Sequence, residues 1–232
     1  MRLHRFYVYK PLGEEIVVDS AGEEKELLHQ WTHVFRLKSG DEVFLFSKST
    51  PGTDFLYRFT SLSKEEAHLT PVSQLPNILP KEGTLVMALV KKDTFETIVR
   101  QATELGITRI IPLLASRSEK KNLNFDRLKA ISIEAAEQCG RGDVPEITSI
   151  SSFEEAHSLT EDLHNIVGSL HGEMGLSENK KSLVLWVGPE GGWTPEEEIL
   201  MEGKGFFSFK LTETVLKADT AAIALLSAIQ SA

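Results

Sequence analysis

Cysteine is almost absent from this sequence: Cys139 is the only one among 232 residues. A single cysteine excludes an intrachain disulfide and every zinc site that uses several thiolates, and it predicts a reducing, cytoplasmic location. No apolar run approaches the ~20 residues that a membrane-spanning helix needs. The charged start of the chain also lacks the apolar segment of a secretory signal. We therefore expect a globular cytoplasmic protein that does not enter a membrane.

Several common catalytic motifs are missing as well. No Gly-Lys-Ser/Thr marks a P-loop, no Gly-x-Gly follows the first strand of the predicted α/β part, and no Gly-x-Ser-x-Gly marks a serine hydrolase. His29 and His33 have the i, i+4 spacing of a zinc-peptidase helix, but the glutamate base and a nearby third ligand are missing. We therefore predict no metal site and none of these enzyme classes.

Positive charge is scarce: 25 Lys and Arg stand against 34 Asp and Glu, which gives a net charge of −9. This balance argues against nonspecific binding to nucleic acids, because such binding depends on neutralising phosphates. The charge is uneven, however, with a net +3 over residues 91–141 and a net −11 over residues 143–202. A mildly basic face on an acidic protein fits a selective RNA partner, and solvated helix faces explain the same split about equally well.

Two kinds of pattern divide the chain. Residues 1–73 alternate apolar and polar residues in short stretches broken by glycines, which predicts a small β-barrel with one helix over 24–37. Two prolines within Leu75–Pro80 indicate a linker. Residues 74–232 alternate strands and helices, which predicts an α/β domain with a largely parallel sheet covered on both faces. Ligands of such sheets bind at the carboxyl ends of the strands.

Hydrophobic periodicity and capping signals place the elements of this α/β domain. The predicted strands cover 84–90, 107–114, 165–170, 183–187 and 206–211, and the predicted helices cover 93–105, 125–139, 194–202 and 220–231.

The segment Val187-Gly188-Pro189-Glu190-Gly191-Gly192 directly follows a predicted buried strand and precedes a helix capped by Thr194. Glycines in such a turn let the main chain approach a ligand closely, and Pro189 stiffens the turn. A tight strand-to-helix turn without a ligand explains the spacing about equally well. The segment is therefore either a small-molecule site or a plain turn.

Two further segments gather polar side chains at helix ends. Residues 211–220 place hydroxyls, a cation and a carboxylate before the last helix, where Thr220 alone is most simply an N-cap. Residues 134–141 run from a helix end into a loop. Arg141 at this exit suits an RNA phosphate, and it equally suits a surface cation near a helix C-terminus.

Together these segments resemble the bacterial 16S rRNA uridine-N3 methyltransferase family of the SPOUT superfamily. The resemblance covers nearly the whole chain, and its specificity comes from the order and spacing of segments that are weak alone. The segments are Arg2–Tyr7, His33–Asp41, Ala102–Ile107, Ile111-Pro112, Ser116–Ser118, Glu134–Arg141, Val144–Ile147 and Val187–Gly192.

The resemblance implies a PUA-like, RNA-binding β-barrel over residues 1–73 and a SPOUT-type domain with a deep trefoil knot over residues 74–232. It also implies a homodimer, S-adenosyl-L-methionine (AdoMet) as the cofactor, and methyl transfer to N3 of a uridine in 16S rRNA, as RNA or within the small ribosomal subunit. Such an enzyme must expose the base and align its N3 with the methyl group.

The same resemblance implies three groups of functional residues. Within the catalytic group, Glu137 and Gln138 orient the base and Arg141 grips phosphate. The cofactor-binding group is Leu170, Val187, Gly188, Pro189, Glu190, Gly191, Gly192, Leu211, Val215, Leu216 and Thr220; the RNA-binding group is Arg2, Arg5, Arg36 and Arg117; the catalytic group is Glu137, Gln138, Arg141, Lys217 and Asp219.

The last loop departs from the family pattern. Thr214 and Lys217 stand where relatives carry arginine, Thr212 replaces a glycine, and Asp219 replaces a glutamate. Lysine keeps the charge of arginine but loses its bidentate fork. This departure motivates an alternative hypothesis, an RNA- or ribosome-binding protein of the same fold with an altered target or without catalysis.

Overall fold

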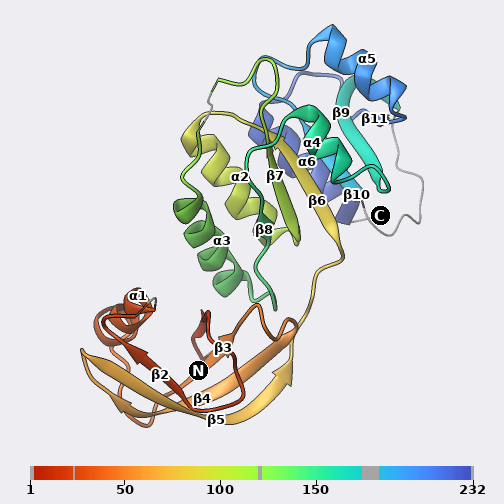
Figure 1. Ribbon diagram of the computed structural model, residues 1–232. Helices are drawn as coiled ribbons and strands as arrows, with labels where there is room; N and C mark the ends of the chain where they lie inside the picture. The colour runs from red at the N-terminus through yellow and green to blue at the C-terminus, as the bar shows by residue number, and fades with distance from the viewer. Residues whose placement is uncertain (1–2, 23, 120–121, 174–182, 231–232) are drawn as a thin grey trace. The chain divides into compact units, whose positions relative to one another are not determined.

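A computed structural model describes residues 3–22, 24–119, 122–173 and 183–230 (Figure 1). The chain divides into two compact units. The first contains Met1–Leu79 and the inserted segment Ala136–Val144, and the second contains Pro80–Ala135 and Pro145–Ala232. The first boundary lies inside the proline-containing stretch that was predicted to be a linker. The first unit thus also includes residues 136–144, and the predicted division into domains at residues 73 and 74 stays a prediction.

The first unit is built on a five-stranded sheet in the order β1-β3-β4-β5-β2. β1 pairs in parallel with β3, and the other pairs are antiparallel. Within the described residues β1 and β2 are the two edges, so this sheet is open where a closed barrel was predicted. The strands are β1 (Arg5–Tyr7), β2 (Ile16–Asp19), β3 (Glu42–Phe46), β4 (Thr53–Leu62) and β5 (Glu66–Pro76).

The helix predicted over 24–37 is shorter and less regular. α1 (Lys25–His29) continues into a π-helical turn, η1 (Gln30–Val34). Trp31 in this turn is fully buried, and its ring meets those of Phe6 and Phe59 edge to face. This aromatic contact holds the irregular helix against the sheet, since edge-to-face pairs add to the stabilisation from burial.

The inserted segment is tied to the rest of the first unit by main-chain hydrogen bonds. The amide of Gly142 donates to the carbonyl of Ile78 at 2.9 Å, and the amide of Gly52 donates to the carbonyl of Gly142 at 3.1 Å. The amide of Tyr7 donates to the carboxylate of Glu137 at 2.8 Å. These bonds satisfy main-chain groups that would be costly to leave without partners.

The second unit contains a six-stranded sheet in the order β11-β9-β10-β6-β7-β8, and all its strand pairs are parallel. The predicted parallel α/β fold is therefore confirmed. The strands are β6 (Gly83–Ala88), β7 (Arg109–Leu113), β8 (Glu146–Ile147), β9 (His164–Glu173), β10 (Leu183–Val187) and β11 (Phe207–Phe209); the helices are α2 (Lys92–Glu104), α3 (Phe125–Cys139), α4 (Phe153–Ser158), α5 (Pro195–Gly203) and α6 (Ala218–Gln230).

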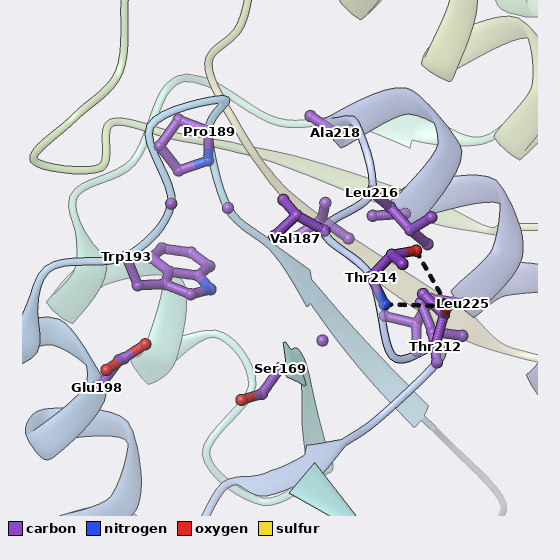
Figure 2. A pocket seen from close by; sticks show the side chains of 16 residues that line it. Ser169, Val187, Pro189, Trp193, Glu198, Thr212, Thr214, Leu216, Ala218 and Leu225 are labelled. Carbon is purple, nitrogen blue, oxygen red and sulfur yellow. Dashed lines mark hydrogen bonds between the residues drawn. The ribbon is translucent and has the colours of Figure 1, made fainter. Parts of the chain in front are cut away.

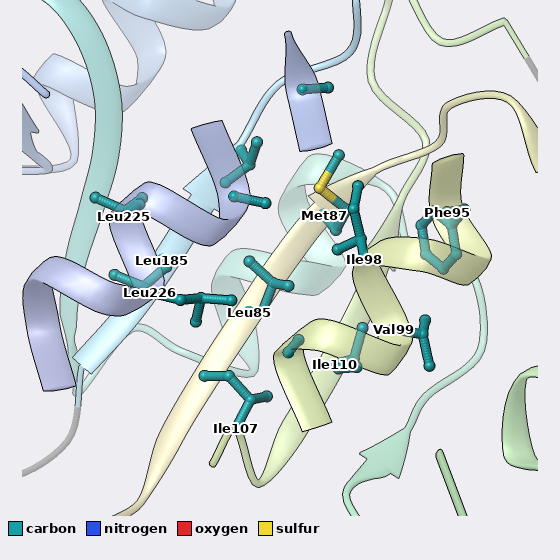
Figure 3. Packing of buried hydrophobic residues seen from close by; sticks show 14 of the residues in the cluster. Leu85, Met87, Phe95, Ile98, Val99, Ile107, Ile110, Leu185, Leu225 and Leu226 are labelled. Atoms are coloured by element: carbon teal, nitrogen blue, oxygen red, sulfur yellow. The ribbon is translucent and has the colours of Figure 1, made fainter. Parts of the chain in front are cut away.

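Helices cover both faces of this sheet. Successive residues of a strand point to opposite faces, so apolar residues along one strand pack against helices on both sides. Leu85 and Met87 of β6 pack with buried residues of α2 and α6 (Figure 3). Buried residues of α3 belong to the same cluster. Val86 and Ala88 of the same strand pack with residues of α4 and α5. The sheet is thus buried on both sides. Among the described helices, none combines the length and apolarity required to cross a lipid bilayer.

A buried polar contact joins the two strands that lead to the site. The indole Nε1 of Trp186 on β10 donates to Oδ1 of Asn165 on β9 at 2.7 Å. The side-chain Nδ2 of Asn165 donates to the main-chain carbonyls of Thr160 and Leu163. Since buried polar groups are costly without partners, this network fixes the lateral position of the two strands.

Gly172 tests the packing of β9 against β11. A Cβ atom at Gly172 would overlap the carbonyl oxygen of Ser208 and lie 2.8 Å from the amide of Phe209. We expect Gly172→Ala to lower the free energy of unfolding by about 1–3 kcal/mol, measured by urea denaturation. Gly203→Ala is the matched control: open space surrounds this position, so stability should stay the same or rise slightly. Wild-type stability of Gly172→Ala would contradict the described packing.

Candidate functional site

A pocket of about 240 Å³ lies where the β10–α5 connection meets the β11–α6 connection (Figure 2). The two connections are residues 188–194 and 210–217, and both contribute to its lining. Ser169 of β9 and Leu225 of α6 complete the wall. The pocket therefore lies at the carboxyl ends of parallel strands, where α/β folds bind ligands.

The first wall depends on glycines at two positions with different roles. Gly188 follows the end of β10, and a Cβ atom there would lie 3.0 Å from the indole of Trp193. Gly192 has a φ of +68° and donates its amide to the carbonyl of Pro189 at 2.9 Å. The sequence thus forms a tight turn whose closing residue, Trp193, folds back over the strand end.

The second wall is the segment that leads into α6. The amide of Thr214 donates to the hydroxyl of Thr212, and the two hydroxyls lie 3.3 Å apart (Figure 2). Such side-chain to main-chain bonds hold a turn without regular structure. The next residue, Val215, lines the pocket while 80% of its surface is exposed. Leu216 then turns inward, and α6 begins at Ala218.

Polar groups in the pocket are few. Figure 2 shows Trp193 and Glu198 on one side of it and Thr212 and Thr214 on the other. Glu198 lies in the first turn of α5, with its carboxylate among otherwise apolar or neutral lining residues. A mostly apolar cavity with a small number of placed polar groups is the usual form of a small-molecule site.

The start of α5 is held by a complete capping box. The hydroxyl of Thr194 accepts from the amide of Glu197, and the carboxylate of Glu197 accepts from the amide of Thr194. The pKa of Glu196 is lowered because its own main-chain amide and the Thr194 hydroxyl stabilise the carboxylate, with a smaller contribution from Arg117. The site therefore adjoins a firmly fixed helix start.

Most of the predicted cofactor-binding residues come together here. Glu190 and Gly191 lie in the same turn but are not among the lining residues, and Thr220 lies in the first turn of α6 rather than at its cap. The backbone of Leu170 lies on β9, but its side chain is outside the described part of the structure. The predicted residues that line the pocket are Val187, Gly188, Pro189, Gly192, Leu211, Val215 and Leu216.

The sequence-based prediction missed several lining residues. Trp193 directly follows the predicted turn, and Ser169 lies near the end of the strand predicted over 165–170. The position of both residues close to the site could therefore have been predicted. Others depend on which segments meet in space. The lining residues that were not predicted are Gly168, Ser169, Trp193, Glu198, Thr212, Thr214, Ala218, Ala221 and Leu225.

The predicted RNA-binding arginines have different environments. Arg2 lies outside the described residues. Arg5 is only 10% exposed in its side chain, pairs with both carboxylate oxygens of Asp54 and stacks over the ring of Phe46. Arg36 is exposed and has a φ of +54°, a conformation that few non-glycine residues adopt. Their contacts with RNA stay predictions.

Arg141 is not the exposed cation that its position at a helix exit suggested. Its side chain is 6% exposed and pairs with both carboxylate oxygens of Asp143 at 2.8 Å. The surface-cation interpretation is therefore wrong, because the neighbouring aspartate neutralises a largely buried guanidinium. Glu137 and Gln138 belong to the first unit with Arg141, and the catalytic roles of the three residues stay predictions.

Lys217 and Asp219, the other predicted catalytic residues, lie at the start of α6 beside the second wall. Lys217 is exposed, and its carbonyl accepts from the amide of Ala221. A carboxylate oxygen of Asp219 accepts from the amide of Thr220 at 2.8 Å. The structure thus brings these two side chains next to the pocket-lining segment, while neither is itself a lining residue.

The chain is similar to RNA methyltransferases in comparisons with a family model and with curated proteins. A family model described as an RNA methyltransferase domain matches residues 77–230. The ribosomal RNA small subunit methyltransferase E of Rickettsia conorii is 30% identical, covering 99% of this chain and 96% of its own length. The protein of the same name from Synechocystis is 32% identical, covering 94% and 75%.

Solved structures agree over almost the whole chain. A methyltransferase of Legionella pneumophila in complex with bound SAM (AdoMet) has a TM-score of 0.88 and 26% identity, covering 100% of this chain and 98% of that one. A ribosomal RNA small subunit methyltransferase E of Neisseria gonorrhoeae bound to S-adenosyl methionine has a TM-score of 0.87 and 26% identity, covering 99% and 98%.

Gly188 offers a test of the pocket that needs no ligand. Because Gly188→Ala places a methyl group against the indole of Trp193, we expect the ring to move outward. Trp31 and Trp186 are fully buried, so acrylamide quenching of tryptophan fluorescence should report mainly on Trp193 and should increase. Gly168→Ala, at a lining position with open space, should leave quenching unchanged. Equal quenching in both variants would contradict the contact.

Proposed function

The chain belongs to the RNA methyltransferase family, and from this premise we propose that it transfers the methyl group of AdoMet to N3 of a uridine in 16S rRNA of the small ribosomal subunit. The observation that carries the proposal is the pocket formed by residues 187–193 and 211–218. The relatives of known structure with bound AdoMet match this chain over its full length.

The lining residues fit such a cofactor. Val187, Leu211 and Leu216 offer apolar surface for a flat adenine ring, and the turn of residues 188–192 offers main-chain groups for polar atoms. AdoMet carries a positively charged sulfur, so a carboxylate in the lining, that of Glu198, has the complementary sign. The net charge of −11 over residues 143–202 supports the same assignment, because an acidic region favours a cationic ligand.

AdoMet, when bound, supplies a methyl group on a cationic sulfur that N3 of uridine can attack. The protein must hold the base in line with that bond, keep water away and accept the N3 proton. We assign Lys217 to the RNA side of the reaction, because it is exposed and cationic beside the pocket-lining segment. Asp219 is held by the amide of Thr220 in the same helical turn, which suits a positioning role for its carboxylate.

The first unit contributes the RNA-binding half of the proposal. Arg36 is an exposed cation in a constrained turn, which suits a phosphate contact. Gln138 is exposed at the end of α3 and can contact a base, and Glu137 accepts from the amide of Tyr7. We propose that the Arg141–Asp143 pair orders this segment in the free protein and that RNA phosphate competes with Asp143 for Arg141 in the complex.

The remaining family features are proposed on the same premise: a PUA-like first unit, a trefoil knot in the second, a homodimer and a cytoplasmic location. The knot is supported by residues 211–218, which return from β11 to the end of β10 before α6 packs into the core. The homodimer and the cytoplasmic location rest on the family resemblance alone.

Ala221 on α6 tests cofactor binding. Because this small side chain lines the pocket, Ala221→Phe should fill part of the space and weaken AdoMet binding at least about tenfold, measured by titration calorimetry. Ala130→Phe, at an exposed position of α3, should bind as the wild type does. Unchanged affinity in Ala221→Phe would show that AdoMet binds elsewhere. Urea denaturation of both variants checks that each is folded.

The reaction itself is tested in cells. A strain without this gene should lack one methyl group on one uridine of its 16S rRNA, detected by mass spectrometry, and the wild-type gene should restore it. Ala130→Phe should restore it fully, and Ala221→Phe should restore it to a smaller extent. An unchanged methylation pattern in the deletion strain would refute the proposed target. AdoMet binding without transfer to any RNA would instead favour the non-catalytic alternative raised by Thr214 and Lys217.

A further inference from the structure

We infer that Arg117 is a positioning residue of the cofactor pocket, which fixes the main chain of the turn that carries Trp193. The identity of the ligand, AdoMet, rests on the proposed function, whereas the contacts of Arg117 with the turn do not depend on it. The resemblance to the family assigns Arg117 to RNA binding, whereas its contacts in the structure lie on the cofactor side.

The guanidinium of Arg117 bridges the turn. Its NH1 nitrogen donates to the carbonyl of Gly191 at 2.9 Å and to the carbonyl of Trp193 at 3.0 Å. The two carbonyls flank Gly192, whose φ of +68° reverses the chain. A guanidinium nitrogen carries two N–H groups, so a single NH1 can serve both acceptors. A cation between these dipoles offsets their mutual repulsion and holds the reversed chain.

The stem of Arg117 also packs on the turn. A Cβ atom at Gly191 would lie 3.2 Å from the Cβ atom of Arg117 and 3.4 Å from its Cδ atom. Gly191 is not a lining residue of the pocket. The approach of the arginine therefore explains a glycine at this position, and a contact of Gly191 with the cofactor stays a prediction.

Arg117 is itself held in place by the loop after β7. The amide of Ser116 donates to Oε1 of Glu197 at 2.8 Å, while Oε2 of the same carboxylate accepts from the amide of Thr194. Glu197 is 9% exposed, so these charge-assisted bonds are largely shielded from water. Arg117 binds the carbonyls of Gly191 and Trp193, and Glu197 binds the amides of Ser116 and Thr194. Together the two side chains fix residues 191–194 at both ends.

The consequence for the pocket passes through Trp193. Its indole packs on Gly188 and lines the pocket, and its carbonyl is one of the two acceptors of Arg117. If the bridge is lost, the main chain of Trp193 is free to shift and the aromatic wall moves with it. A loose wall must then be ordered on binding, which lowers affinity for the ligand without altering the groups that contact RNA.

Arg117→Ala is the direct test, compared with Arg117→Lys and with the control Arg109→Ala. Arg109 lies at the other end of β7 and pairs with the exposed carboxylate of Glu146. Without RNA, we expect Arg117→Ala to weaken AdoMet binding about tenfold or more. Arg117→Lys should recover part of the affinity, because its ammonium retains the charge and can donate to both carbonyls but ends a shorter, more flexible side chain. Arg109→Ala should bind as the wild type does.

Two further measurements separate positioning from a general loss of stability. In steady-state methyl transfer, Arg117→Ala should raise the KM for AdoMet while kcat at saturating AdoMet stays near the wild-type value. Acrylamide quenching of Trp193 should increase in Arg117→Ala and not in Arg109→Ala, and this readout holds even if the wild type fails to bind AdoMet. Wild-type affinity and quenching in Arg117→Ala, with weaker RNA binding alone, would overturn the inference.

Discussion

Main-chain amides and carbonyls need hydrogen-bond partners also where a parallel strand ends and the chain leaves the sheet. The second unit depends on how this requirement is met after the end of β10. The chain leaves the strand at Gly188 and must reach the start of α5 within a few residues. Main-chain bonds within the turn, the Thr194–Glu197 capping box and the bridge from Arg117 satisfy main-chain groups of this connection. The connection fixed in this way forms one wall of the pocket.

This arrangement explains why a site in an acidic protein is compatible with an RNA substrate. The proposed cofactor pocket offers main-chain groups and one carboxylate, that of Glu198, whereas the arginines predicted to contact RNA lie partly in the first unit. Two of these arginine side chains, Arg5 and Arg141, are paired with Asp54 and Asp143. Paired cations attract polyanions less strongly than free ones, so selectivity must come from the shape of the RNA and from exposed cations such as Arg36.

Periodicity and capping signals predicted the α/β architecture because they are local. The helix expected over 194–202 is Pro195–Gly203 in the structure, and the strand expected over 183–187 has those bounds. α4 was missed because it is short, although Ser152 and Glu155 form a capping box that could have revealed it.

The pocket was only half predictable for a different reason. A sequence shows that the turn after Val187 is rich in glycine, but it does not show that the indole of Trp193 folds back onto Gly188 or that Arg117 reaches Gly191. Contacts between distant segments follow from the sheet order, which periodicity leaves open. The same reason hid Asp54 as the partner of Arg5, whereas Asp143 lies only two residues from Arg141 in the sequence.

The inserted segment has a consequence for how the protein is made. The amides of Tyr7 and Gly52 find their acceptors on residues that follow them by more than eighty positions, at Glu137 and Gly142. A nascent chain released from the ribosomal tunnel therefore cannot finish its amino-terminal unit until much of the second unit has also emerged. A fragment cut near residue 79 would lack both acceptors and would leave the amides of Tyr7 and Gly52 without these partners.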